Sequence, residues 1–323
     1  MYLKVAMNVP LKDRFRGCLI GLAVADALGG RFEAQTADHI VRRFGTAERL
    51  INYVTDEIWY TDDTQMAIAV AESLSDHGEI IEERLCESFV ANYTPSRGYG
   101  MGARAVLRAM EDGGDYGSVA ANHFPGGSYG NGAAMRVAPV GLLFRGDVQR
   151  VIDQSRLSAL PTHLHPLGIE GAQLLALAVS YASTVETLDR GAFFAQLLNH
   201  CQSSEYRDKL EDAATTNSPK ELASLGNRIE AFESVPTAIA SFALTPNSFQ
   251  DTIANVIFLG GDTDTLAAMA GAISGAFLGI DAIPRVLIDN LESTPKGKAY
   301  IIELSDRLLH AYQQRMETSA SDT

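Results

Sequence analysis

Two short segments near opposite ends of the chain concentrate oxygen donors immediately before apolar stretches. Residues 61–64 read Thr-Asp-Asp-Thr and residues 262–265 read Asp-Thr-Asp-Thr. Aspartate and threonine at a helix start can cap free backbone N–H groups, and this structural role is the alternative for either segment alone. Together the segments hold four carboxylates and four hydroxyls, whereas a cap needs one oxygen. The pair therefore indicates more than capping.

A divalent cation would explain this concentration of acid. Carboxylates at the edge of an apolar core carry a large desolvation cost, and neither segment contains a Lys or Arg that could offset it. The positive ends of the helices that follow would help to hold the anions. Donors that are all oxygen favour Mg²⁺, Mn²⁺ or Ca²⁺ over zinc. Two ions about 3.5–4 Å apart that share an aspartate fit the number of donors, so the segments predict a binuclear metal centre.

A glycine-rich segment, residues 124–132, could receive an anion. Four of the seven residues from Gly126 to Gly132 are glycine, which lets backbone N–H groups approach a phosphate without a Cβ in the way. The segment does not match G-x-x-x-x-G-K-[ST], the loop of nucleoside triphosphatases. A simple tight loop is the alternative. Phe124 and Tyr129 could stack on a base or anchor the loop to the core.

Two histidines and one glutamate are further candidates. His163 and His165 could donate hydrogen bonds or stack in a cleft, or they could simply stand at a helix entry. Zinc ligation is not expected because no third soft ligand lies at a characteristic spacing. Glu33 follows a glycine pair, and the pattern alone is that of a surface loop residue.

Helices must position these groups. The 323 residues contain 46% hydrophobic and 20% charged residues, enough for one large core or two moderate domains. Helical periodicity recurs without a repeat or a charged linker, which predicts one compact all-α domain. Alternating strand patterns are scarce, and residues 50–60 are the best candidate. The stretches with helical periodicity are residues 15–24, 66–74, 170–182, 193–198 and 266–278.

The chain divides into three expected parts. Residues 13–312 form the domain, residues 1–12 an N-terminal extension without the apolar region of a signal peptide, and residues 313–323 a frayed tail. Glycine-rich loops are expected at residues 98–102, as well as in the segment described above. The longest apolar run, residues 266–280, is shorter than the ~20 residues that span a bilayer, so we expect a buried core helix.

Charge and cysteine content exclude several classes of function. The net charge of −14 disfavours nucleic acid, which needs Lys and Arg against its phosphates, and disfavours anionic membranes. Cys18, Cys86 and Cys201 are scattered and odd in number, so we expect buried, reduced thiols in a cytoplasmic protein. A monomer is expected.

Five motifs in register carry a family resemblance. They lie at residues 16–26, 61–64, 130–136, 162–163 and 260–265. The motifs occur in the order in which the ADP-ribosylglycohydrolase family has them, and the chain resembles that family across residues 13–312. The family includes dinitrogenase-reductase-activating glycohydrolase and the ADP-ribosyl-acceptor hydrolases.

Other segments are most similar to the branch of that family that removes ADP-ribose from serine and degrades poly(ADP-ribose). They are residues 97–100, 127–132 and 226–238, with Phe32-Glu33 matching the mobile glutamate of that branch. The segment around Phe124 is one residue shorter than the pattern of the branch, and His165-Pro166 replaces small residues. Both departures lie in the expected ligand groove.

The resemblance implies a fold, a metal centre and a substrate site. The fold would be an orthogonal helical bundle with two Mg²⁺ ions, for which Mn²⁺ could substitute. The implied catalytic residues are Glu33, Asp62 and Asp264. The implied metal ligands, with Glu33 beside them, are Thr61, Asp62, Asp63, Asp262, Asp264 and Thr265. The implied substrate contacts are Gly98, Tyr99, Phe124, Gly126, Gly127, Ser128, Tyr129, Gly130, Asn131, Gly132, His163 and Ile229.

The activity that the resemblance implies is hydrolysis of the glycosidic bond between ADP-ribose and a protein acceptor, with release of ADP-ribose. The acceptor would be serine, and poly(ADP-ribose) would be a further substrate. One alternative is the same hydrolase acting on arginine-linked ADP-ribose. Another is a non-catalytic member of the family that binds ADP-ribose or has a structural role.

Overall fold

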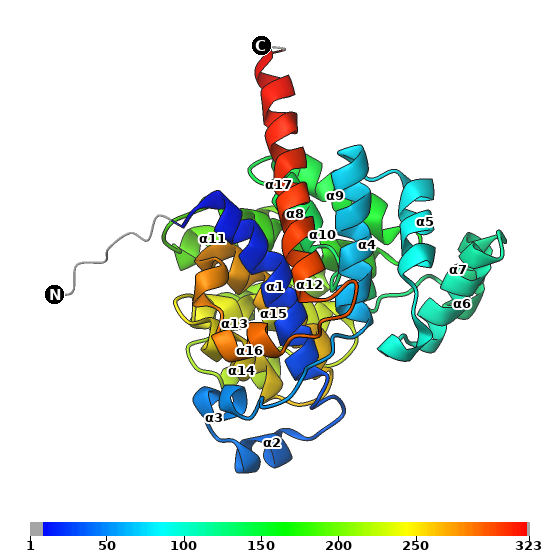
Figure 1. The fold of residues 1–323 in the computed structure, drawn as a ribbon. Coiled ribbons are helices and arrows are strands. Elements are labelled where there is room, and N and C mark those ends of the chain that lie inside the picture. The colour runs from blue at the N-terminus through cyan, green and yellow to red at the C-terminus, as the bar shows by residue number, and fades with distance from the viewer. Residues whose placement is uncertain (1–8, 322–323) are drawn as a thin grey trace.

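The computed structural model describes residues 9–321, and the expected extension at residues 1–12 lies mostly outside this range. Within it the chain folds into seventeen α-helices and four short 3₁₀ helices, and pairing of strand type is confined to three isolated bridges (Figure 1). The predicted all-α class is confirmed. The α-helices are α1 Leu11–Gly29, α2 Ala37–Arg43, α3 Ala47–Asn52, α4 Asp62–His77, α5 Glu82–Asn92, α6 Met101–Glu111, α7 Tyr116–His123, α8 Ala138–Leu143, α9 Val148–Ala159, α10 Pro166–Thr184, α11 Arg190–His200, α12 Ser204–Thr215, α13 Ala231–Leu244, α14 Phe249–Ile257, α15 Thr263–Leu278, α16 Arg285–Asn290 and α17 Lys298–Ser321. The 3₁₀ helices are η1 Pro95–Arg97, η2 Asn131–Ala133, η3 Glu221–Ser224 and η4 Ile280–Ala282.

Helices α1 and α15 run antiparallel through the centre of the molecule and touch backbone to backbone (Figure 1). Glycines make this approach sterically feasible. A Cβ added to Gly275 would lie 1.9 Å from the carbonyl oxygen of Gly17, and one added to Gly21 would lie 2.6 Å from that of Gly271. The predicted core helix at residues 266–280 is therefore confirmed as α15, with its end at Leu278.

The same close packing brings the two acidic segments together. A Cβ on Gly29, at the end of α1, would lie 2.4 Å from the carbonyl oxygen of Thr263, and the Thr263 hydroxyl donates to the Gly29 carbonyl (2.8 Å). A Cβ on Gly30 would lie 3.1 Å from Thr61 Cγ2. The end of α1 therefore meets the starts of both α4 and α15.

The remaining helices surround this centre. Helix α17 packs on α1 and α4, and α10 packs on α8, α9, α13 and α15. Helices α6 and α7 pack on each other and stand out at one side of the molecule, with α5 between them and α4 (Figure 1). The short α2 and α3 lie at the end where α1 finishes. The site described below opens between these groups of helices.

Five expectations about local structure can now be compared with the fold. The helices expected at residues 66–74, 170–182 and 193–198 are confirmed within longer helices. The strand candidate at residues 50–60 is wrong. It begins as the end of α3 and continues as a loop, whose alternating apolar residues are buried as anchors. The segment 98–102 is a loop only up to Gly100, because α6 begins at Met101.

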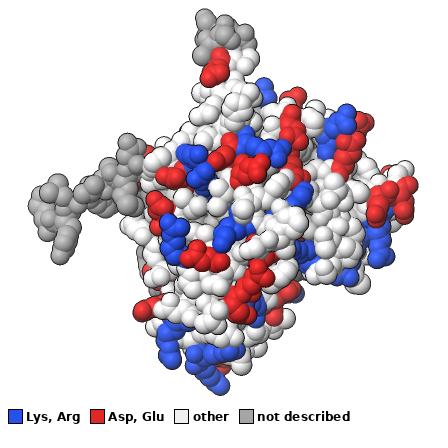
Figure 2. Space-filling model, in the orientation of Figure 1, with Lys and Arg blue, Asp and Glu red and all other residues white. Residues whose placement is uncertain are grey.

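The tail and the surface complete the description. Helix α17 continues to Ser321, through most of the segment expected to be frayed. The three cysteines are buried and free, as expected. Among residues 9–321, none of the helices is long and apolar enough to cross a bilayer. Acidic and basic side chains are interspersed over the face drawn in Figure 2.

Candidate metal and substrate cleft

Most of the residues singled out in the sequence line one cavity of about 380 Å³. It is bounded by the starts of α4 and α15, by the loops before and after α6 and α7, and by the glycine segment. Chain segments more than two hundred residues apart thus face one space. The predicted residues that line it are Glu33, Asp62, Asp63, Gly98, Phe124, Ser128, Gly130, Asn131, Gly132, His163, Ile229, Asp262, Asp264 and Thr265.

The first acidic segment forms the start of α4. The hydroxyl of Thr61 caps the helix, accepting from the Asp63 amide (3.4 Å) and donating to Asp63 Oδ2 (3.0 Å). Asp26, fully buried on α1, accepts hydrogen bonds from the backbone N–H groups of Thr61 and Thr64 (3.0 Å each) and from the Thr64 hydroxyl. The capping role weighed for this segment is therefore real, yet Asp62 and Asp63 both remain on the cavity wall.

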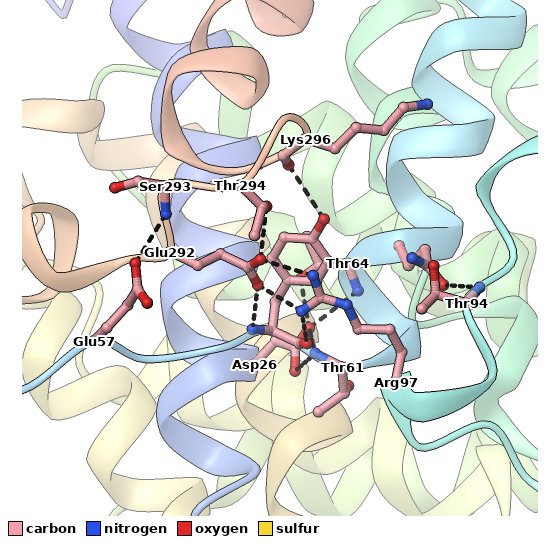
Figure 3. Close-up of polar contacts among 12 residues, drawn as sticks. Asp26, Glu57, Thr61, Thr64, Thr94, Arg97, Glu292, Ser293, Thr294 and Lys296 are labelled. Carbon is pink, nitrogen blue, oxygen red and sulfur yellow. Dashed lines mark hydrogen bonds and ion pairs between the residues drawn. The ribbon is translucent and has the colours of Figure 1, made fainter.

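A buried ion pair holds the loop that leads into this segment. Arg97 donates to both carboxylate oxygens of Glu292 (2.5 and 2.7 Å) and to the carbonyl oxygen of Tyr60 (2.7 Å). Glu292 also accepts from the Tyr60 amide (3.2 Å) and from the Thr294 hydroxyl (2.7 Å). Figure 3 shows these groups converging directly before Thr61. The position of the first acidic segment therefore depends on a contact between residues 195 positions apart in the chain.

The second acidic segment forms the start of α15 and is tied to the glycine segment. The Asp262 amide donates to the Asn227 carbonyl (3.1 Å), and Asp262 Oδ2 accepts from Asn131 Nδ2 (2.6 Å). The Thr265 amide donates to Asp264 Oδ1 (2.9 Å). Because the Asn131 side chain joins the glycine segment to Asp262, it fixes the position of the glycine-rich wall of the cavity relative to the acidic wall.

Glu33 lies on a short loop that is held on both sides. Phe32 is buried, and the amide of Ala34 donates to the carbonyl of Gly261 (3.0 Å), one residue before the second acidic segment. Ala34 has φ of +61°, the one positive φ outside glycine in the described range, and such strained residues cluster at functional sites. Burial, and then the charge of Asp262, raise the pKa of the Glu33 carboxyl above its usual range. A carboxyl group with a raised pKa suits proton transfer.

The carboxylates crowd one another. Burial, reinforced by Asp26, raises the pKa of Asp62 to about 7. Burial, with the charge of Asp262, raises the pKa of Asp264 to about 9. Burial and the charge of Asp264 also raise the pKa of Asp63 well above its usual range. Without a counter-charge, these groups would be forced to hold protons at neutral pH, since like charges in a low-dielectric site cannot all ionise.

The chain itself supplies little positive charge to this site. Arg136 lines the cavity, but its guanidinium donates to the carbonyls of Gly132 (3.2 Å) and Ser158 (2.8 Å) and to the Thr162 hydroxyl (2.9 Å). Asp63 Oδ1 is buried and has no hydrogen-bond partner among residues 9–321. An orphaned, buried carboxylate oxygen among other carboxylates fits a hard cation, which prefers oxygen ligands.

No three His, Cys, Asp or Glu side chains in the described range are grouped so that they alone could hold one ion. An ion here would complete its shell with threonine hydroxyls, water or ligand oxygens, as Mg²⁺ commonly does. Thr61 and Thr265 lie beside the carboxylates and carry such hydroxyls. The donor set therefore fits a hard cation whose shell includes hydroxyl or water oxygens beside the carboxylates.

A relay of hydrogen bonds orients His163. Since a guanidinium can only donate, Thr162 Oγ1 accepts from Arg136, and its own proton faces two acceptors, His163 Nδ1 at 2.7 Å and the Ala159 carbonyl at 3.5 Å. Donation to the nearer acceptor leaves Nδ1 without a proton of its own. In this arrangement Nε2 carries the ring proton. Burial, and then the charge of Arg136, lower the pKa of His163 to about 3, so the ring is neutral near pH 7. A Cβ on Gly132 would lie 3.3 Å from Nε2, which therefore offers an N–H donor beside the glycine segment.

Apolar groups gather at the rim of the glycine segment. Phe124 and Ile229 line the cavity while exposing 38% and 66% of their surface, which leaves room for a planar ligand. The Tyr129 ring packs edge-on against His165 (5.5 Å between centroids) and is half exposed. The His165 side chain caps α10, accepting from the Leu167 amide (3.2 Å). Of the two histidines, His163 thus faces the cleft and His165 stands at a helix entry.

With this geometry in view, comparisons with known proteins are informative. The family model of ADP-ribosylglycohydrolases matches residues 7–318. The chain belongs to the ADP-ribosylglycohydrolase family. Proteins named ADP-ribosylhydrolase ARH3 are similar over most of their length: 36% identity for that of Xenopus tropicalis, covering 96% of this chain and 98% of the relative, and 37% for that of Homo sapiens, covering 84% and 87%. The resemblance stated from the motifs is confirmed.

A solved structure shares the family's fold. A protein titled "ADP-ribosylglycohydrolase-related protein complex" superposes with a TM-score of 0.71 at 23% identity, covering 94% of this chain and 99% of the other. The helical fold expected for an ADP-ribosylglycohydrolase is therefore confirmed. The enzyme class is confirmed as well: the chain is a hydrolase of this family that acts on ADP-ribosylated substrates.

Some residues expected at the site of this ADP-ribosylglycohydrolase do not line the cavity. Tyr99 is buried, and its hydroxyl donates to Gln65 Oε1 (2.8 Å), so it supports the wall from behind. Gly127 lies against the His165 backbone, where an added Cβ would come within 2.3 Å of the amide nitrogen. The others that lie outside the lining are Thr61, Gly126 and Tyr129.

Sequence reasoning also missed functional neighbours. Asp26 is the one charged residue in the stretch of α1 from Gly17 to Gly29, and that isolation was a usable signal. Met66, Met101, His123 and Arg136 line the cavity too, but apolar and basic residues of this kind are common in helices. Arg136 closes the family motif at residues 130–136, but nothing in the spacing of the other three distinguishes them from core or surface residues.

Proposed function

We propose that this ADP-ribosylglycohydrolase cleaves the bond between C1″ of ADP-ribose and the side-chain oxygen of serine in a protein, with two Mg²⁺ ions or, in their place, Mn²⁺. Poly(ADP-ribose) is a further substrate in this proposal. The observation that supports it is one cavity lined by both acidic segments, by Glu33, and by Ser128 and residues 130–132 of the glycine segment. One ADP-ribose molecule could thus contact the acidic segments with its ribose hydroxyls and the glycine segment with its diphosphate.

The two halves of ADP-ribose would contact different walls. Adenine would lie against the exposed faces of Phe124 and Ile229, with Tyr129 beside them. The diphosphate would accept from the Ser128 hydroxyl, from the Nε2–H group of His163 and from backbone amides of the glycine segment other than those of Gly127, Gly130 and Asn131, which already donate within the protein. These donors are neutral, which explains how a protein of net charge −14 can receive an anion without a basic patch.

The acidic wall would receive the distal ribose. Thr61, Asp62, Asp63, Asp262, Asp264 and Thr265 would hold the two ions, which when bound supply ligands for ribose hydroxyls and offset the carboxylate charge. Hydrolysis joins a water oxygen to C1″ and breaks the bond from C1″ to the serine oxygen, which keeps the electron pair. The serine oxygen must gain a proton and the water must lose one. Glu33, whose pKa is raised, would move these protons.

Serine is favoured over arginine as the acceptor because several segments resemble the branch of the family that removes ADP-ribose from serine. These segments are residues 32–33, 97–100, 127–132 and 226–238. Hydrolysis of serine-linked and arginine-linked ADP-ribosyl peptides should be measured side by side, each with and without a chelator. We expect turnover of the serine peptide alone, abolished by the chelator and restored by excess Mg²⁺. Turnover of only the arginine peptide, or activity indifferent to chelation, would contradict the proposal.

Removing one carboxylate should remove both turnover and the response to metal. Saturating Mg²⁺ at about 100 times its dissociation constant stabilises a protein by about 2.7 kcal/mol. We expect the wild type to show such a thermal shift and Asp264→Asn to lose it together with its turnover. Asp264→Asn that keeps its activity would count against the metal centre.

Glu33→Gln separates catalysis from binding. Loss of a general acid or base slows catalysis by about 10²–10⁴-fold, whereas the amide is nearly the same size as the carboxyl group. Calorimetry with ADP-ribose should give nearly the same affinity for this variant as for the wild type, while peptide hydrolysis falls by that factor. A wild type that binds ADP-ribose yet hydrolyses no peptide would instead be a non-catalytic member of the family.

A further inference from the structure

A second groove, of about 500 Å³, opens beside the catalytic cleft. It lies between the loop that precedes α4 and the loop that precedes α6. Among the residues that line it are Trp59, Tyr60, Thr94, Arg97 and Gly98. Trp59 exposes 55% of its surface, an unusual position for the single tryptophan of the chain. Thr61 and Gly98 also line this groove, but Trp59, Thr94 and Ser96 have no role in the assignments made above.

The groove and the cleft meet at Gly98, which lines both. A Cβ on Gly98 would lie 3.4 Å from Asp62 Oδ1 and 4.0 Å from Thr61 Cβ. Gly98 and Thr61, which also lines the groove, thus stand between the groove and the carboxylates of the first acidic segment. The glycine segment 126–132 contributes nothing to the lining of the groove, so the groove joins the cleft on its acidic side.

The walls of the groove are fixed in place. The Arg97 guanidinium lies over the Tyr60 ring (4.0 Å) and near the Trp59 ring (5.6 Å), while its N–H groups are held by Glu292 and by the Tyr60 carbonyl. Figure 3 shows the Arg97 and Glu292 side chains directed at each other. The charge of Arg97 is therefore neutralised within the protein. What remains exposed is the Trp59 ring, with the exposed Thr94 and Ser96 near it, since Tyr60 is buried.

The chemistry of these walls selects among occupants. A second ADP-ribose unit would bring a diphosphate, which needs free cations or several N–H donors, and the one guanidinium of the groove is already paired. A polypeptide needs apolar contact area and a few hydrogen bonds, and an exposed tryptophan provides the former at little cost in side-chain entropy. The walls therefore suit a peptide better than a polyanion.

We propose that the groove between Trp59 and the segment 94–98 is an acceptor subsite that binds the polypeptide flanking the ADP-ribosylated residue. This inference rests on the proposed function, because it places the distal ribose at the acidic wall. The bond to be cleaved then lies beside Gly98, and the acceptor chain continues from there into the groove. Trp59 contacts that chain and leaves the ADP-ribose moiety untouched.

Kinetics with two substrates test the subsite. One substrate is a serine-ADP-ribosylated peptide, and the other is O-linked ADP-ribosyl-N-acetylserine amide, which lacks flanking residues. For Trp59→Ala we expect KM for the peptide to rise about tenfold, as for a central aromatic contact, with kcat retained. The small substrate should show unchanged constants. Trp59→Phe should recover most of the loss, and Met316→Ala, which removes an equally exposed apolar residue on α17, should behave as the wild type.

Fluorescence of the single tryptophan gives a second readout that does not require turnover. In Glu33→Gln, the modified peptide should change the emission of Trp59, whereas ADP-ribose alone should bind without changing it. An emission change with free poly(ADP-ribose) but not with the peptide would assign the groove to the polymer and overturn the proposal.

The remaining outcomes separate this inference from the function it rests on. If Trp59→Ala affects both substrates equally, or neither, the acceptor subsite is refuted while the hydrolase activity stands. If the wild type hydrolyses neither substrate, the proposed function fails and the subsite fails with it.

Discussion

Replacement of Arg97 by methionine should destabilise the protein far more than the loss of an ordinary surface ion pair. Methionine keeps much of the length of the side chain and its packing over the Tyr60 ring, but removes every N–H group. Three hydrogen bonds disappear, two to Glu292 and one to the Tyr60 carbonyl. The Glu292 carboxylate would then be left with only the Tyr60 amide and the Thr294 hydroxyl as donors.

The size of the effect follows from burial. The Glu292 side chain is 0% exposed and that of Arg97 is 13% exposed, so the carboxylate cannot be rehydrated without opening the loop. Removing one partner of a buried ion pair costs about 3–5 kcal/mol because an uncompensated charge remains. The pair between Arg42 and Asp38, with side chains 81% and 82% exposed, should contribute only about 0.3–0.5 kcal/mol.

Urea unfolding measures both quantities in the same protein. We expect Arg97→Met to lose about 3–5 kcal/mol of unfolding free energy and Arg42→Met to remain within about 0.5 kcal/mol of the wild type. Adding Glu292→Gln to Arg97→Met should recover part of the loss, because no charge is then left buried; the double-mutant cycle gives the coupling energy. A loss for Arg97→Met no larger than that for Arg42→Met would refute the reasoning.

Two further predictions concern the glycine segment and the dependence on pH. Gly126 and Gly127 have similar φ values, +87° and +89°, but an added Cβ meets nothing within 4 Å at Gly126 and comes within 2.3 Å of the backbone at Gly127. Calorimetry with ADP-ribose should therefore show a much larger loss of affinity for Gly127→Ala, and equal losses would contradict the steric argument. Burial raises the pKa of Glu72, but hydrogen bonds, that from Lys296 first, outweigh it and lower the pKa. A depressed pKa stabilises the fold above the pKa of the unfolded chain, and this contribution is lost as the pH falls through the folded value. The stability difference between the wild type and Glu72→Gln, from urea midpoints, should thus shrink below about pH 4.5; a constant difference would contradict the assignment.

Much of the fold could be predicted because helical periodicity is a local property. The starts of α4 and α15 carry Asp and Thr, residue types common at helix starts, directly before apolar stretches, so both helices could be placed from the sequence. Of the two N-cap residues, Thr61 makes a side-chain capping bond and Asp262 does not. The failure at residues 50–60 has a physical cause. An anchored loop with alternating buried side chains presents the same pattern as a half-buried strand, and only tertiary contacts tell the two apart.

The part of the site that consists of oxygen donors clustered in the sequence could be predicted. The part that depends on contacts between residues far apart in the chain could not. Asp62 and Asp264 stand out because carboxylates at the edge of an apolar helix need a reason to be there. Glu292, by contrast, reads as one more acidic residue in a loop, and its contact with Arg97 spans 195 positions. The resemblance suggested Tyr99 as a substrate contact, but the structure places it behind the wall because its hydroxyl is taken by Gln65.

The convergence of the two acidic segments depends on residues that carry no chemistry of their own. Helices α1 and α15 touch through Gly17, Gly21 and Gly275, where any Cβ would meet a backbone atom at 2.6 Å or less. A wider separation of these helices would move the start of α15 away from the end of α1, and with it Asp264 from the Asp26 carboxylate that fixes the start of α4. The spacing of the carboxylates is thus set by backbone contact in the core. Packing of this kind resists small deformations. It can therefore keep the carboxylates close together despite their mutual repulsion, which a bound cation would balance.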